Sequence, residues 1–179
     1  MRLVRSTLYA AGMAVEQKEV RWLSEPEMAA WRSYIVATMR LRQRLHRELS
    51  ERHDVTLADY EVLVCLSLQS DNRMRMTELA SMLGSTKSRL SHQMVRLEAE
   101  GLIRRTRDPA DKRGVVAEMT GRGAELLDGA APTHVEGVRE HLIDLLSPEE
   151  HQVLGRAFDR VLKHLSEIDG LPRLPPVTS

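Results

Sequence analysis

Apolar residues recur at three- and four-residue steps along most of the chain, which is the spacing of amphipathic helices. Ser24 and Pro26 give the first of these patterns a typical helix start, and Thr56, Thr77 and Thr86 are suited to cap later ones. The pattern predicts helices over Pro26 to Arg52, Leu57 to about Leu68, Glu78 to Leu83 and Lys87 to Glu100, a long one after Thr120, and a last one after Ser147. A break or kink is expected at Pro132.

A different periodicity follows Gly101. Residues 102–107 and 115–119 alternate well enough for two antiparallel strands, and the segment Asp108-Pro-Ala-Asp-Lys-Arg-Gly between them has the composition of a turn. A short strand is also expected over residues 73–76, before a helix. The chain is therefore predicted to be mainly α with a small β-wing.

The helix after Thr86 has two dissimilar faces. On a helical wheel, Leu90, Met94 and Leu97 lie on one side, whereas small, polar and basic side chains lie roughly opposite. A helix that only packs would more often expose Glu and Lys. With Gly84 allowing a sharp turn before it, the segment reads as a helix-turn-helix whose second helix can enter a DNA groove.

Charge supports this reading only locally, because the formal net charge is zero. Residues 71–115 carry ten Lys or Arg against six Asp or Glu, an excess of four positive charges, whereas residues 116–179 carry six against eleven. The excess thus falls on the segment that would approach phosphates. A solvated surface with chance clustering of charge explains it equally well.

Composition excludes several classes of protein. A single cysteine, Cys65, excludes an internal disulfide and fits a reducing compartment, and no apolar run approaches the ~20 residues of a membrane span. Leu8 to Val15 is too short for a signal-peptide core, so we expect a cytoplasmic protein. No nucleophile and base pair, metal motif or phosphate loop is evident, so we expect neither an enzyme nor a cofactor.

In this order and spacing, the motifs resemble the multiple-antibiotic-resistance regulator (MarR) family of winged-helix transcription factors. The matching residues are Leu79-Ala80, Leu83-Gly84, Arg96-Leu97-Glu98, Gly101-Leu102, Asp108-Pro109, Asp111-Lys112-Arg113, Met119-Thr120 and Gly123. Close similarity covers about Val55 to Asp128. The chain departs from the family at Ser85 and Gln93, where apolar side chains are more usual.

The resemblance implies a homodimer that binds double-stranded DNA and is held together by helices from both ends of each chain. We expect an N-terminal extension over residues 1–25, loosely ordered or docked in the dimer. An N-terminal dimerisation helix over 26–54, a winged helix-turn-helix DNA-binding domain over 55–120, C-terminal dimerisation helices over 121–168 and a flexible tail over 169–179 complete the prediction. Apolar stripes at both ends of the chain independently favour a dimer.

The way such a winged helix docks on DNA predicts roles for individual residues. For each of them the alternative is that the side chain is merely a solvated part of the surface. Base edges in the major groove are expected to be read by Ser88, Arg89 and His92, and phosphates to be held mostly by Thr86, Lys87, Ser91 and Arg96. Arg113 at the wing tip should enter the minor groove, and Lys112 should contact the sugar-phosphate backbone of the DNA. Asp111 is expected to hold the tip in shape.

Regulation is less visible in the sequence. Effectors of this family typically bind between the dimerisation helices and the winged lobe, which makes Trp31, Tyr34 and Tyr60 a candidate effector pocket, although core packing explains these aromatics at least as well. Histidines seven residues apart are too distant to share a metal ion, so none is expected. A winged-helix module that binds only proteins remains the alternative function.

Overall fold

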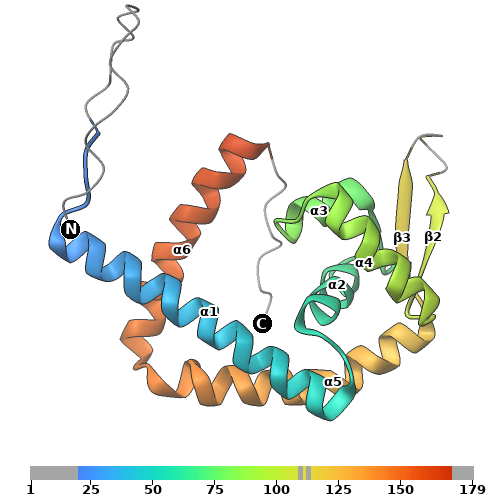
Figure 1. The fold of residues 1–179 in the computed structure, drawn as a ribbon, viewed down its shortest axis with the longest axis horizontal. Coiled ribbons are helices and arrows are strands. Elements are labelled where there is room, and N and C mark those ends of the chain that lie inside the picture. Colours follow the sequence, from blue (N-terminus) through green and yellow to red (C-terminus); the bar gives the residue numbers. More distant parts are fainter. Residues whose placement is uncertain (1–19, 109–110, 112–113, 171–179) are drawn as a thin grey trace, which may run out of the picture. The chain divides into compact units, whose positions relative to one another are not determined.

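A computed structural model describes residues 20–108, 111 and 114–170 of the chain (Figure 1). Two compact units are distinguished, Met1–Val36 and Ala37–Ser179. Within the described part of the first unit, the chain enters its first helix at Glu25. The second unit holds the rest of that helix and every other helix and strand described below.

The elements follow in the predicted order. They are α1 (Glu25–His53), α2 (Leu57–Ser67), β1 (Arg73–Arg75), α3 (Met76–Met82), α4 (Lys87–Ala99), β2 (Ile103–Arg107), β3 (Val115–Met119), α5 (Gly121–His141), the 3-10 helix η1 (Ile143–Leu145) and α6 (Pro148–Asp169). The fold is mostly helical with a small antiparallel sheet, so the predicted fold class is confirmed.

The sheet has three strands in the order β1-β3-β2, all antiparallel. In its register, Arg73 lies opposite Glu118 and Ile103 lies opposite Met119. The sequence predicted both the hairpin and the short first strand, but not that the latter would pair with β3. This pairing brings the start of the helix-turn-helix against the base of the wing.

One apolar core joins the helix-turn-helix to the sheet. It takes fully buried side chains from α2, α3 and α4, including Leu63, Leu79, Leu90, Met94 and Leu97, together with residues of all three strands. Burying a Leu or Met side chain stabilises a fold by about 1.5–3 kcal/mol. The packing face that the helical wheel predicted for residues 87–100 is therefore confirmed.

Helix capping matches the sequence at most positions. Thr86 Oγ1 accepts from the backbone N–H of Arg89 at 3.2 Å, and Ser147 forms a reciprocal capping box with Glu150. The cap expected at Thr77 is wrong, because β1 runs directly into α3 and the helix already begins at Met76 without a side-chain cap.

The break expected at Pro132 is wrong, since α5 continues from Gly121 to His141, whereas a kink there stays a prediction. Proline removes one backbone hydrogen bond, to the carbonyl four residues earlier, and here that carbonyl belongs to Asp128. Both residues are exposed. Water can therefore satisfy the carbonyl, and the helix continues past the proline.

A second core connects α5 to the C-terminal half of α1, around Leu45, Leu49 and Tyr60. Beside it, the buried carboxylate of Glu48 accepts from Arg44 at 2.6 Å and contacts His141 Nε2 at 2.8 Å. Burial raises the pKa of Glu48, but the contacts with His141 and Arg44 outweigh it and hold that pKa below its ordinary value. Polar and apolar contacts together thus join the two helices.

Candidate nucleic-acid interface

The outward face of α4 is polar, basic and free of large aliphatic side chains except at Val95. Leu90, Met94 and Leu97 are fully buried against the core. All the α4 residues predicted to contact DNA are exposed, namely Lys87, Ser88, Arg89, Ser91, His92 and Arg96, as is the cap residue Thr86. Such a surface can donate hydrogen bonds to base edges and phosphates.

Glycines set the ends of this helix. Gly84 adopts φ +57° between α3 and α4, where its neighbour Ser85 donates to the carbonyl of Ala80 at 2.9 Å. Gly101 adopts φ +73° after α4, and Leu102 donates back to Leu97 at 2.9 Å. Both positions need the left-handed backbone that glycine adopts without strain. The sharp turn predicted at Gly84 is confirmed.

Cations on this surface differ in whether they are paired. Lys87 and Arg89, at the N-terminal end of α4, form no ion pair with any residue that the structure describes. Arg104 instead lies 2.6 Å from Glu118 across the hairpin, and the hydrogen bond with Arg104 lowers the pKa of that carboxyl. The local charge excess seen in the sequence is therefore partly neutralised within the fold, whereas Lys87 and Arg89 keep exposed charges without an ion-pair partner among the described residues.

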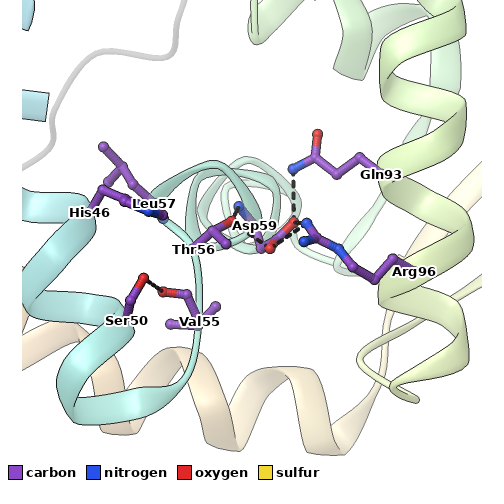
Figure 2. A network of polar contacts seen from close by, with 8 residues as sticks. All are labelled: His46, Ser50, Val55, Thr56, Leu57, Asp59, Gln93 and Arg96. Carbon is purple, nitrogen blue, oxygen red and sulfur yellow. Dashed lines mark hydrogen bonds and ion pairs between the residues drawn. The ribbon is translucent and has the colours of Figure 1, made fainter. Parts of the chain in front are cut away.

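Arg96 also has a partner, which the sequence did not predict. Its terminal nitrogen lies 2.5 and 2.6 Å from the two carboxylate oxygens of Asp59 in α2 (Figure 2). Gln93 donates to the same carboxylate at 3.0 Å. Arg96, predicted to hold a phosphate, thus lies within an internal contact between α2 and α4.

A second ion pair ties α4 to the wing. The carboxylate of Glu98 accepts from the backbone N–H of Arg105 at 2.8 Å and from its guanidinium at 2.9 and 2.6 Å. The side chain and the backbone N–H of Arg105 both hold the pKa of Glu98 below its ordinary value. The matched sequence motif contained Glu98, but no local pattern indicated its partner in β2.

The turn of the wing is anchored at its base. Arg75 Nε, at the end of β1, lies 2.6 Å from Asp108 Oδ2, and the side chain of Asp108 is buried. The carbonyl of Asp111 accepts from Gly114 at 2.8 Å. Asp111 is exposed, and its predicted support of the tip stays a prediction. Lys112 and Arg113, predicted at the tip, lie outside the described residues.

The aromatics of the candidate effector pocket lie in different environments. Trp31 and Tyr34 belong to the first unit, with ring centroids 6.0 Å apart, and both are exposed. Tyr60 belongs to the second unit, where it is buried with its ring 4.7 Å from that of His134. Core packing accounts for Tyr60, and the pocket stays a prediction.

Cys65 is partly buried, and several histidines form hydrogen bonds within the fold. Burial raises the pKa of the Cys65 thiol to about 11, which disfavours the reactive thiolate. His53 Nε2 lies 2.8 Å from the hydroxyl of Thr133. In the part of the chain that the structure describes, no three His, Cys, Asp or Glu side chains are grouped as metal ligands would be. No helix within those same residues is long and apolar enough to cross a membrane.

Comparison with known proteins agrees with this geometry. A family model described as the MarR family matches residues 55–115. An uncharacterised HTH-type transcriptional regulator of Bacillus cereus is 31% identical over 130 residues, which cover 73% of this chain and 84% of the relative. The transcriptional regulator HosA of Escherichia coli O111:H- is 31% identical over 112 residues, covering 63% of this chain and 81% of that protein.

Two solved structures are similar over nearly their whole length. AbsC, a MarR family transcriptional regulator from Streptomyces coelicolor, is 40% identical with a TM-score of 0.76, covering 83% of this chain and 99% of that one. Sco3205, a MarR family regulator from the same organism solved in complex with DNA, is 42% identical with a TM-score of 0.77, covering 83% of this chain and 92% of that one.

Proposed function

Because the chain belongs to the MarR family of transcriptional regulators, we propose that it binds a pseudo-palindromic operator as a homodimer and represses transcription by occluding a promoter. It is a regulator and not an enzyme. The observation that carries the proposal is the division of α4, whose apolar face is buried while its small, polar and basic face is exposed. The DNA complex of the similar Sco3205 supports it.

In this proposal α4 is the recognition helix. Ser88, Arg89 and His92 read base edges in the major groove, while phosphates are held by Lys87 and Ser91. The exposed cap residue Thr86 adds a phosphate contact at the helix N-terminus, where backbone N–H groups also point outward. The wing brings Arg113 into the adjacent minor groove and Lys112 to the sugar-phosphate backbone of the DNA.

Apolar surface that one chain leaves uncovered supports dimerisation. Six large aliphatic side chains of α6 are between 36% and 65% exposed: Val153, Leu154, Val161, Leu162, Leu165 and Ile168. A face of this kind on a helix normally packs against a partner. We assign it to a second copy, which would place two recognition helices about one turn of DNA apart.

Release by a small molecule is the natural form of control for such a repressor. A ligand that binds one arrangement of the dimer better than another shifts the population away from the DNA-binding state. The exposed aromatics Trp31 and Tyr34 supply stacking surface for an effector. The rival function, binding of protein alone, has no comparable use for the basic face of α4.

DNA binding is tested with the region upstream of the chain's own gene, by gel shift and fluorescence anisotropy at several salt concentrations. We expect tight, salt-sensitive and sequence-selective binding, severely weakened by Arg113→Ala and Arg89→Ala. Arg139→Ala, an exposed arginine of α5 paired with Asp144, is the matched control and should bind normally. Unchanged affinity in Arg113→Ala would remove that assignment, and no sequence preference would favour the rival function.

A further inference from the structure

The carboxylate of Asp59 is a buried acceptor shared by two helices. It lies in the first turn of α2, and its side chain is 6% exposed. Oδ1 accepts from Arg96 at 2.5 Å and from Gln93 at 3.0 Å, while Oδ2 accepts from Arg96 at 2.6 Å and from Thr56 at 2.5 Å. A buried charge is tolerated only when it is paired and hydrogen-bonded, as this one is.

We propose that Asp59 is a positioning residue for DNA binding, which fixes the rotation of α4 through Arg96 and Gln93, and that Arg96 serves this contact rather than a phosphate. The inference rests on the proposed function of α4 as the recognition helix. It gives Arg96 a role different from the one expected from its exposed position. It also gives a role to Gln93, where the family more usually has an aliphatic side chain.

Apolar packing alone leaves the rotation of α4 loosely determined. Leu90, Met94 and Leu97 are fully buried, but hydrophobic contacts are not directional, so they set the angle of the helix less sharply than hydrogen bonds do. A rotation of about 20° moves a side-chain tip some 5–6 Å from the helix axis by about 2 Å, which breaks a hydrogen bond. Arg96 and Gln93, three residues apart on one face, therefore restrict the rotation when both bind one carboxylate.

Asp59 can act as a fixed point because it is itself held. Its backbone N–H donates to Thr56 Oγ1 at 3.1 Å, so the carboxylate belongs to the cap of α2. Another N–H of the same turn, that of Leu57 at the start of α2, donates to His46 Nδ1 of α1 at 3.3 Å. Figure 2 shows this succession of contacts from α1, through the start of α2, to α4.

A phosphate contact by Arg96 would compete with this arrangement. The guanidinium nitrogen that reaches both oxygens of Asp59 cannot move to a phosphate without leaving a buried carboxylate short of its strongest donor. Lys87 on the same helix has no ion pair among the described residues and carries no such penalty. The two cations should therefore respond differently in a binding experiment.

Asp59→Asn separates the two roles by the sign of its effect. If Arg96 holds a phosphate, removing the negative charge frees Arg96, and DNA affinity should stay equal or rise. If Asp59 positions α4, affinity for a duplex selected by the wild-type protein from random-sequence DNA should fall about tenfold or more, as expected for one lost base contact. Affinity for a scrambled duplex of equal length should change less than about threefold.

Salt dependence gives a second readout, measured by fluorescence anisotropy on the same duplexes. Lys87→Ala, the control, should reduce the slope of log affinity against log salt by about 0.9, as expected for one lost phosphate contact. Arg96→Gln should weaken selective binding and leave that slope unchanged. A reduced slope in Arg96→Gln, or undiminished selectivity in Asp59→Asn, would overturn the proposal.

Circular dichroism checks that each variant is folded. Should a single variant unfold, the double variant Asp59→Asn/Arg96→Gln, which leaves no unpaired charge, takes its place, and undiminished selectivity in the folded double variant would overturn the proposal. Where both single variants fold, the loss of selectivity in the double variant should be smaller than the sum of the single losses. Additive losses would contradict a shared role. A wild-type protein without any sequence preference would instead overturn the proposed function, and with it this role.

Discussion

Gly123, in the first turn of α5, lies close to Leu102, which follows α4, and to Met119 at the end of β3. We expect Gly123→Ala to destabilise the fold, although alanine is the better helix former. A Cβ at this position would overlap the carbonyl oxygen of Leu102, and it would lie 3.2 Å from its carbon and 2.9 Å from Met119 Cγ. These atoms do not belong to the far end of a flexible side chain.

The size of the destabilisation depends on whether the carbonyl group of Leu102 can move away from the added Cβ. It accepts from the backbone N–H of Thr120 at 3.0 Å and from its hydroxyl at 3.1 Å, so a shift would weaken the cap of α5 as well. Overpacking costs about 1–3 kcal/mol, and alanine recovers at most about 1 kcal/mol of helix propensity. We expect a net loss of about 2 kcal/mol, which lowers Tm by about 4–8 °C in a chain of this size.

Gly129 in the same helix provides the matched control. Nothing lies within 4 Å of a Cβ built there, so Gly129→Ala should stabilise the protein by about 0.5–1 kcal/mol. Thermal unfolding followed by circular dichroism compares the two variants. Both are measured at equal protein concentration, because the stability of the proposed dimer would depend on it. Equal stabilisation by both would refute the close approach of α5 to Leu102.

Two predictions concern titration. Cys65, whose pKa burial raises to about 11, should react with a thiol reagent at pH 8 far more slowly in native protein than in urea; equal rates would contradict its burial. Burial lowers the pKa of His134 below its ordinary 6.5, so the unfolded chain binds the proton more readily. Stability should therefore fall as pH drops below about 6.5, and His134→Phe, which keeps a ring beside Tyr60, should reduce that fall. An unchanged pH dependence in this variant would show that His134 does not contribute.

Local pattern was enough to predict the helices, the wing hairpin and the buried face of α4. The helical period placed Leu90, Met94 and Leu97 inside, and small polar residues at helix starts marked caps such as Thr86. Each of these follows from neighbours within a few residues. The helix break predicted at Pro132 was wrong because the cost of a proline depends on whether water reaches one carbonyl, which is a property of the fold.

Contacts between distant residues were not predictable in the same way. Asp59 and Arg96 are 37 positions apart, and no period or motif links an acid in one helix to an arginine in another. From the sequence, Arg96 was one more cation on an exposed face. The fold pairs it, whereas Lys87 and Arg89 are left without an ion-pair partner among the described residues.

Selection of particular DNA sequences by the proposed dimer is tested most directly with random DNA. Purified protein is incubated with a pool of random-sequence duplexes, and the bound fraction is amplified and sequenced over successive rounds. We expect enrichment of one pseudo-palindrome with half-sites about 10 base pairs apart, or a multiple of that spacing. Bound fragments without a shared sequence would contradict it.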